Sequence, residues 1–296
     1  MDTYTRKAYA KINLGLDVIG RLENGYHQVR MIMQTVGICD ELTFEKRPSG
    51  IRITLEGPEG MAAGQELPLD ENNLIYKAAS LMLEEYGIAE GVAIRLRKNI
   101  PIAAGMAGGS TDAAATFHGI NELFGLQASQ ESLKKLGLRV GADVPYCIMG
   151  GTALAEGIGE KLSPLPSPPG CFLAVAKPDI SVSTKYVYEH LDEEGVPSHP
   201  DIDGMINALE SGDLGGIVSR LGNVLERVTV KRHPVIDELK REMTEGGALG
   251  SLMSGSGPTV FGIFSSGAQA REACERIAEK QLAKQVFVTG FCEGGT

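Results

Sequence analysis

PIAAGMAGGSTDAAA, residues 101–115, runs from a loop of small residues into what reads as the start of a helix. Small side chains let the backbone approach a ligand closely, and the unpaired N–H groups and dipole of a helix N-terminus favour an anion. The stretch lacks the Gly-Lys-Ser/Thr ending that brings a lysine to the terminal phosphates in the better-known phosphate loop. It therefore predicts either a phosphate site or an ordinary helix capped by Ser110 or Thr111.

Composition indicates a soluble protein large enough for two domains. The chain has 296 residues, of which 43% are hydrophobic and 22% charged, close to the average for soluble globular proteins. No apolar run approaches the length that spans a bilayer. Residues 1–7 lack the apolar core of a signal peptide, so we expect a cytoplasmic enzyme.

Charge and cysteine usage exclude several classes of partner. A net charge of −10 without a basic stripe argues against nucleic acid. A polyphosphate ligand would then depend on individual basic residues such as Lys98, three residues before the glycine loop. The five cysteines are scattered without CxxC spacing, so we expect buried free thiols and neither a disulfide framework nor a zinc site.

The N-terminal half reads as strands that alternate with helices. Period-two alternation predicts strands within 8–18, 51–55 and 92–96. Helical spacing predicts helices over 72–83 behind an asparagine cap, over 110–124 up to Gly125, and over 130–138. The prolines within 162–170 predict a surface connection, so we divide the chain into domains at 1–160 and 161–296.

The C-terminal half begins with a short buried strand over 172–176. Helical patterns follow at 184–191, 203–210, 213–227 and 234–245. A strand over 260–264, a helix over 268–280 and a strand over 285–291 complete an alternation typical of α+β or βαβ layers.

Two polar positions could carry chemistry. Lys11 and Asn13 share one face of a predicted strand, opposite Ile12 and Leu14, so they either reach into a cleft or form a solvated face. Asp143, between small residues and before a proline, is either a helix N-cap or, beside a lysine, a general base.

Two further segments could bind a ligand. Asn24-Gly25 predicts a turn that presents Tyr26 and His27, although a plain hairpin gives the same pattern. Residues 254–258, SGSGP, form a second glycine- and hydroxyl-rich loop in the other half of the chain. Two such loops favour a shared ligand in a cleft between the domains.

These motifs, in this order and across nearly the whole chain, resemble those of the GHMP kinases, which include galactokinase, homoserine kinase and mevalonate kinase. The three superfamily motifs correspond to 11–14, 101–115 and 254–258. Similarity is greatest to the members that phosphorylate the 2-hydroxyl of 4-diphosphocytidyl-2-C-methyl-D-erythritol in non-mevalonate isoprenoid biosynthesis, through segments 10–14, 25–27, 141–145 and 182–184. The resemblance implies an α+β fold, with a ribosomal protein S5 domain 2-like N-terminal domain and a ferredoxin-like C-terminal domain.

The same resemblance implies roles for individual residues, with ATP and Mg²⁺ as cofactors. Asp143 would be the catalytic base, assisted by Lys11. The ATP contacts would be Asn72, Lys98, Pro101, Ile102, Ala103, Ala104, Gly105, Met106, Ala107, Gly108, Gly109, Ser110, Thr111 and Asp112. The substrate contacts would be Asn13, Tyr26, His27, Thr184, Tyr188, Ser254, Gly255, Ser256 and Gly257. We favour Tyr188 over Tyr186 as the residue that stacks on cytosine.

The loop departs from the family at Ala103, Ala104 and Ala107, where glycine is usual. Alanine is disfavoured at positive φ, so we expect ordinary backbone angles at these positions or a slightly reshaped loop. Thr111-Asp112 supplies a hydroxyl and a charge at a point where the family varies, so the sequence does not determine which side chain binds Mg²⁺.

Two alternatives to this function stay open. The first is a GHMP kinase for homoserine, mevalonate or a sugar, which the Tyr26-His27 pair disfavours. The second is a non-catalytic nucleotide-binding relative, which retention of Lys11 and Asp143 disfavours. The expected partner is a small molecule with a cytidine diphosphate group, bound by a monomer or weak homodimer.

Overall fold

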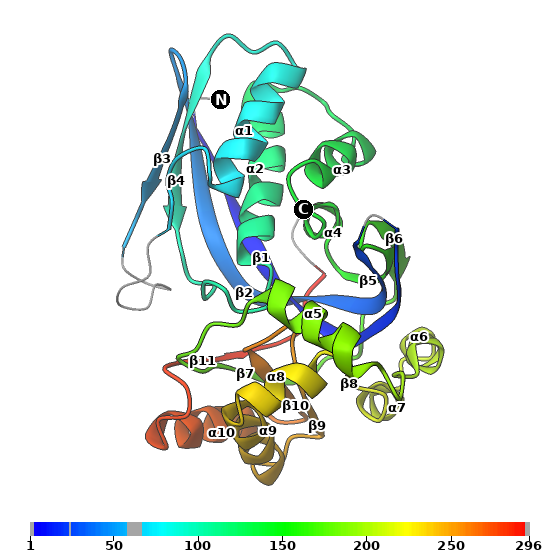
Figure 1. Cartoon of the computed structure of the whole chain (residues 1–296). Helices are drawn as coiled ribbons and strands as arrows, with labels where there is room; N and C mark the ends of the chain where they lie inside the picture. Colours follow the sequence, from blue (N-terminus) through cyan, green and yellow to red (C-terminus); the bar gives the residue numbers. More distant parts are fainter. Residues whose placement is uncertain (1–2, 24, 58–66, 294–296) are drawn as a thin grey trace.

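The computed structural model describes residues 3–23, 25–57 and 67–293. Two sheets, each covered by helices, lie one above the other in Figure 1, with helix α5 (Thr184–Glu194) near the middle. The larger sheet contains β1 (Thr3–Arg21), β2 (His27–Arg47), β3 (Ile51–Leu55), β4 (Gly91–Arg97), β5 (Thr152–Gly157), β6 (Lys161–Leu165) and β8 (Gly222–Asn223).

The hairpin of β1 and β2 is the backbone of the larger sheet. The two strands pair antiparallel along nearly their whole length. The C-terminal part of β2 also pairs with β4, and its N-terminal part pairs with β5, so the sheet branches at β2. Register shifts interrupt the β1–β2 ladder on both sides of the segment that carries Lys11 and Asn13. Such irregularities re-aim side chains, and they are common beside functional sites.

Four helices belong with this sheet. They are α1 (Leu74–Glu85), α2 (Gly108–Phe124), α3 (Gln130–Leu138) and α4 (Val144–Met149). Helices α1 and α2 pack side by side, and Ala78, Phe117 and Phe44 of β2 share one buried cluster. Asn73 caps α1 by accepting a hydrogen bond from the Ile75 N–H at 2.9 Å.

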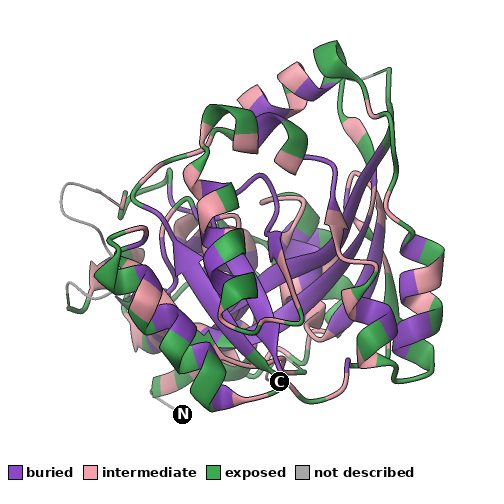
Figure 2. Cartoon of the chain, turned by 90° about the horizontal axis from the view of Figure 1, so that it is seen from below, coloured by how far each residue is buried: buried purple, intermediate pink, exposed green. Residues whose placement is uncertain are grey.

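The C-terminal half builds a four-stranded antiparallel sheet in the order β11-β7-β10-β9. Its strands are β7 (Phe172–Lys177), β9 (Gly250–Met253), β10 (Val260–Phe264) and β11 (Gln285–Thr289). The remaining helices are α6 (Ile202–Glu210), α7 (Leu214–Val218), α8 (Glu226–Arg232), α9 (Val235–Glu245) and α10 (Gly267–Glu279). Figure 2 shows buried strands at the centre of the molecule and helices whose outer faces are exposed. No helix in the described ranges is long and apolar enough to cross a membrane.

Most predicted elements are confirmed, and some to the residue. The strand over 260–264, the helix over 130–138 and the end of α2 at Gly125 agree with the structure. The predicted strands at 8–18, 51–55, 92–96, 172–176 and 285–291 correspond to β1, β3, β4, β7 and β11. The helices predicted at 72–83, 184–191, 203–210, 234–245 and 268–280 correspond to α1, α5, α6, α9 and α10.

The helix predicted over 213–227 is wrong, because three separate elements occupy that range. Helix α7 ends at Val218, and Gly222–Asn223 then pairs parallel with Gly15 and Leu16 of β1 before α8 begins. The Asn223 side chain donates to the carbonyls of Met253 and Gly255, both at 2.8 Å. Tertiary contacts therefore override the local helical pattern.

The proline-rich connection is partly a strand. Residues 161–165 form β6, which pairs with β5 alone, and Pro164 lies opposite Ala153. Proline is tolerated there because an edge strand has one side that donates to no ladder. A division at 160/161 therefore falls between two strands of one sheet, and the domains 1–160 and 161–296 stay a proposal.

The cysteines are free, as expected, but only Cys274 is buried, and the other four are half-buried. Burial raises the pKa of Cys147 and of Cys171 to about 12. The reactive thiolate is therefore disfavoured at both positions.

Candidate active site

A cavity of about 900 Å³ lies where β1, β2, the 101–109 loop and α5 meet. Lys11 and Asn13 project into it from β1, while Ile12 and Leu14 on the opposite face are fully buried in the core. The predicted two-faced strand is thus confirmed, and its polar face lines a cleft rather than facing solvent.

Lys11 lies between two oxygen-bearing side chains. Its Nζ donates to Asn13 Oδ1 at 2.9 Å and lies 3.8 Å from Asp143 Oδ2. Lys11 is only 6% exposed, and the Asp143 side chain is 34% exposed toward the cavity. Asp143 occupies the N-cap position of α4 but makes no side-chain capping bond, so its carboxylate stays available to a ligand. The arrangement places a carboxyl group beside a buried cation, a pairing that suits a general base.

The two small-residue loops touch each other at the cavity. Ser254 Oγ donates to the Gly105 carbonyl at 3.0 Å, although the two residues are 149 positions apart. Gly105 has a φ of +73°, and a Cβ there would lie 2.4 Å from the Ser254 carbonyl oxygen. This close approach requires glycine, which confirms that residues 254–258 belong beside the first loop.

Helix α2 begins at Gly108, two residues before the predicted start, and neither Ser110 nor Thr111 caps it. Ala107 holds the N-cap position with a left-handed φ of +56°, and Ala103 has a φ of +52°. The expectation of ordinary backbone angles is therefore wrong at these two alanines. A left-handed alanine costs roughly 1–2 kcal/mol, which the surrounding structure must offset.

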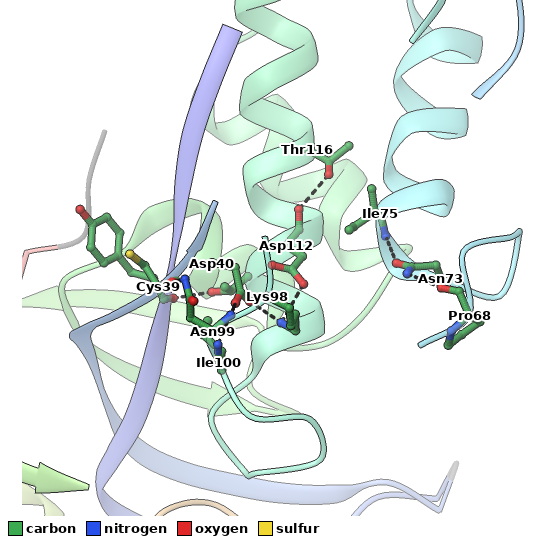
Figure 3. A network of polar contacts seen from close by, with 12 residues as sticks. Cys39, Asp40, Pro68, Asn73, Ile75, Lys98, Asn99, Ile100, Asp112 and Thr116 are labelled. Atoms are coloured by element: carbon green, nitrogen blue, oxygen red, sulfur yellow. Dashed lines mark hydrogen bonds and ion pairs between the residues drawn. The ribbon is translucent and has the colours of Figure 1, made fainter. Parts of the chain in front are cut away.

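Lys98 is held in a buried ionic cluster beneath the loop. Figure 3 shows it between Asp40 and Asp112, with Asp112 Oδ2 at 3.0 Å from its Nζ. Asp40 also accepts from the backbone N–H groups of Asn99 at 2.6 Å and Ile100 at 2.8 Å. The cluster therefore fixes the strand that leads into the loop.

Titration within this cluster follows from burial and charge. Burial alone would lower the pKa of Lys98, but the two carboxylates together raise it. Burial raises the pKa of Asp112 well above its usual range, against the effect of Lys98. Asp112 Oδ1 is buried and has no hydrogen-bond partner among the described residues, although the residue lines the cavity.

The opposite end of the cavity is aromatic. The rings of His27 and Tyr188 are 4.7 Å apart between centroids and tilted by 39°. Both line the cavity, together with Tyr26 and Thr184. Burial raises the pKa of Tyr188 above its ordinary value, so its hydroxyl stays neutral. The two rings contact each other, so a flat ligand does not fit between them. Together with Tyr26 they line the part of the cavity that we call the aromatic slot, where a flat ligand can stack on an exposed ring face.

Tyr186, the alternative to Tyr188, points elsewhere. It stacks on His190 at 3.7 Å between ring centroids and carries the Arg232 guanidinium over its face. It lines a separate, smaller cavity. The structure therefore favours Tyr188 as the aromatic partner of a ligand in the main cavity.

Most predicted site residues line this one cavity. Five do not: Asn72, Met106, Thr111, Ser254 and Gly257. Met106 is buried in the core, and its carbonyl accepts from the Lys11 N–H. Thr111 Oγ1 instead donates to the Tyr9 carbonyl, and Ser254 holds the loop through Gly105, so these residues shape the cavity from behind.

Several cavity residues are absent from the predicted site. Asn73 lines the cavity and Asn72 does not. Asn73 is also the residue that caps α1, so the position of the helix start could have identified it from the sequence. Arg21, Met31 and Glu189 also line the cavity. The predicted turn joins β1 and β2, with Gly25 at a φ of +87°, while Asn24 lies outside the described residues.

Comparison with protein families places both halves of the chain. The model of the GHMP kinases N terminal domain matches residues 73–151, and the model of the GHMP kinases C terminal region matches residues 205–283. Each match lies within one of the two proposed domains.

Curated relatives match nearly the whole chain. The 4-diphosphocytidyl-2-C-methyl-D-erythritol kinase of Lachnospira eligens is 53% identical over 98% of both chains. The protein of the same name from Acetivibrio thermocellus is 47% identical over 98% of this chain and 99% of its own.

Solved structures also match over nearly the whole chain. A crystal structure of 4-(cytidine 5'-diphospho)-2C-methyl-D-erythritol kinase matches with a TM-score of 0.81 and 34% identity, covering 99% of this chain and 100% of its own. A homoserine kinase from Cytophaga hutchinsonii matches with a TM-score of 0.77 and 23% identity, covering 99% and 96%, which shows a shared fold alone. The predicted two-domain α+β fold is confirmed, and this chain belongs to the GHMP kinase family.

Proposed function

We propose that this chain catalyses transfer of the ATP γ-phosphate to the 2-hydroxyl of 4-diphosphocytidyl-2-C-methyl-D-erythritol, releasing ADP and the 2-phosphate. The substrate follows from the names of the relatives that match over the full chain. The reaction type follows from the family, whose members are kinases. A cytoplasmic location and a monomer or weak homodimer stay predictions of the sequence.

One observation carries the proposal: a single cavity holds a base, a phosphate loop and an aromatic slot. Lys11 and Asp143 lie at the wall of the cavity that also carries the 101–109 loop. His27 and Tyr188 line the same cavity and pair with each other. A substrate with a nucleobase at one end and an alcohol at the other fits this order of functional groups. Homoserine and mevalonate carry no base for the aromatic slot.

Asp143 acts as the general base in this proposal. Its carboxylate accepts the proton of the 2-hydroxyl, the freed oxygen attacks the γ-phosphorus, and the bond to the β–γ bridging oxygen breaks. Lys11, 3.8 Å away, stabilises the ionised carboxylate and then the negative charge that develops on the transferred phosphoryl group. Asn13 fixes the Lys11 ammonium by accepting its hydrogen bond.

The 101–109 loop would hold the ATP phosphates. Positive φ angles at Ala103, Gly105 and Ala107 alternate with ordinary ones, a pattern that turns successive backbone N–H groups into a concave anion site. The first turn of α2, at Gly108 and Gly109, adds unpaired N–H groups and the positive end of the helix dipole. These backbone N–H groups are already oriented by the fold, so binding the phosphates would require little rearrangement of the loop.

The cavity also fits Mg²⁺ held mainly by phosphate oxygens. No group of three metal-binding acidic, histidine or cysteine side chains occurs among the residues that the structure describes. Mg²⁺ usually binds one or two carboxylates besides the substrate phosphates, and Asp112 and Ser110, which both line the cavity, would supply a carboxyl group and a hydroxyl group to it. When bound there, the ion would neutralise charge on the phosphates.

Replacing Asp143 by asparagine tests the role of the base. Asparagine keeps the size and removes the basicity, so we expect kcat to fall by at least about 10²-fold with KM little changed. ADP release with the cytidyl substrate measures both constants. Near-normal turnover by a folded Asp143→Asn protein would remove Asp143 from this role.

A further inference from the structure

Asp192 holds one wall of the aromatic slot without lining the cavity. Its Oδ1 is 2.7 Å from His27 Nε2, and its Oδ2 accepts from Arg21 Nη1 at 3.1 Å. Arg21 also donates to the Gly25 carbonyl at 3.3 Å, across the turn between β1 and β2. Asp192 therefore connects the hairpin that presents His27 to helix α5.

The same helix carries the other wall of the slot. Tyr188 and Asp192 are four residues apart on α5, so they lie on one face of the helix. Asp192 binds His27, and Tyr188 lies 4.7 Å from the His27 ring between centroids. The side chain of His27 is 11% exposed, so its ring has little freedom to turn away. One turn of α5 thus fixes the position of the imidazole from two directions.

The Asp192 contact also fixes which ring nitrogen carries the proton. The Asp192 side chain is 33% exposed, and its Oδ2 accepts a hydrogen bond from the Arg21 guanidinium. An ionised carboxylate only accepts hydrogen bonds, so His27 Nε2 must donate. In a neutral imidazole, Nδ1 is then an acceptor, and it is the nitrogen left for a ligand in the cavity.

We propose that Asp192 is a positioning residue that makes the site select cytosine over uracil by holding His27 in the Nε2–H tautomer. Cytosine carries an amino group, a donor, where uracil carries a carbonyl oxygen, an acceptor. An Nδ1 lone pair can accept from the amino group and repels the carbonyl. The inference rests on the proposed function, because it assigns the aromatic slot to the base of the cytidyl substrate.

Base selectivity tests the proposal. We compare kcat/KM for the cytidyl substrate and for its uridyl counterpart in the wild type and in Asp192→Asn. An asparagine can turn either its oxygen or its amide toward Nε2, so the tautomer is no longer fixed. The cytidyl-to-uridyl ratio should fall at least about tenfold, through a higher KM for the cytidyl substrate and an unchanged KM for ATP.

Two variants serve as controls. Asp192→Glu keeps an acceptor-only carboxylate and should retain more of the selectivity than Asp192→Asn. Glu193→Gln removes the same charge from the exposed neighbouring position on α5 and should leave the ratio unchanged.

The tautomer can be observed without turnover. Long-range ¹H–¹⁵N correlation spectra of the unliganded protein at neutral pH distinguish the two neutral tautomers and the cation, with His27→Gln to assign the ring. We expect a single Nε2–H tautomer in the wild type and a mixture in Asp192→Asn. A cationic or Nδ1–H ring in the wild type would overturn the proposal.

The kinetic outcomes separate this inference from the function beneath it. A wild type that does not phosphorylate the cytidyl substrate refutes the proposed function, and the inference with it. If the wild type phosphorylates the cytidyl substrate and Asp192→Asn has the same cytidyl-to-uridyl ratio of kcat/KM as the wild type, only the role of Asp192 is refuted. Equal losses toward both substrates would show a merely structural contact and refute that role too.

Discussion

Single residues give the cavity its chemical polarity. Lys11 is a buried cation whose Nζ donates to Asn13 Oδ1 and lies 3.8 Å from Asp143 Oδ2, the carboxylate of the proposed base. At the opposite end of the cavity, His27 and Tyr188 line the wall with aromatic rings. In the proposed function, the reacting alcohol therefore binds at the polar end of the cavity and the nucleobase at the aromatic end.

Tyr188 and Tyr186 offer a matched test of the aromatic slot. Tyr188→Ala removes a ring from the main cavity, so the KM for the cytidyl substrate should rise about 10-fold or more, since stacking on a base contributes roughly 1–3 kcal/mol. The KM for ATP should not change. Tyr186→Ala, which alters a separate cavity, should leave both constants near the wild-type values. Equal effects of Tyr188→Ala on both substrates would contradict the assignment.

At the scale of elements, the site depends on two loops from opposite halves of the chain and on helices that hold them. Gly105 meets Ser254 where the 101–109 loop contacts the 254–257 loop. Asn223 holds the second loop from β8. Helix α2 leads away from the first loop and packs on α4, the helix that Asp143 precedes. The phosphate loop and the base are thus joined through packed elements.

Gly105→Ala should separate the two loops. The new methyl group would overlap the Ser254 carbonyl and force alanine into a positive φ, so the free energy of unfolding should fall by about 2 kcal/mol or more. Gly109→Ala is the control, because its methyl group meets only Leu74 at 3.5 Å and alanine favours a helix. Urea unfolding measures both. Equal stability of the two variants would contradict the close approach of the loops.

The contact between α2 and α4 should make stability depend on pH. His118 of α2 bonds to the Ile148 carbonyl, and burial lowers its pKa to about 4. The unfolded chain then binds the proton more tightly, so stability present above the unfolded pKa of 6.5 is lost as pH falls toward 4.

We expect His118→Gln to remove this part of the pH dependence. Between pH 7.5 and 4.5, the wild type should lose about 2 to 3 kcal/mol more unfolding free energy than the variant. Urea unfolding at the two pH values measures the difference. Parallel losses in both proteins would show that His118 titrates normally.

At the scale of the whole molecule, the sequence predicts the residues that line the main cavity better than it predicts the strands and loop angles that support them. The polar face of 11–14 and the strand of 260–264 have local signals that tertiary structure leaves unchanged. Strand β2 has none, because residues 31–36 are buried on both faces, which removes the period-two pattern. The positive φ angles of Ala103 and Ala107 are equally invisible in the sequence, because alanine disfavours that conformation and gives no local signal for it.

Asp192 shows the same limit at the site itself. Its position on α5 carries no motif, and only the fold brings it 2.7 Å from a histidine 165 residues earlier in the chain. Residues that touch the ligand follow recognisable patterns. Residues that orient them depend on long-range packing and are seen only in three dimensions.

The substrate is the central claim, and a comparison of three alcohols tests it most directly. ADP release is measured with 4-diphosphocytidyl-2-C-methyl-D-erythritol, homoserine and mevalonate under the same ATP and Mg²⁺ concentrations. Because the cavity contains an aromatic slot that small alcohols leave empty, kcat/KM for the cytidyl substrate should exceed the other two by at least about 10³-fold. Comparable kcat/KM for homoserine or mevalonate, or no ADP release with the cytidyl substrate, would contradict the account.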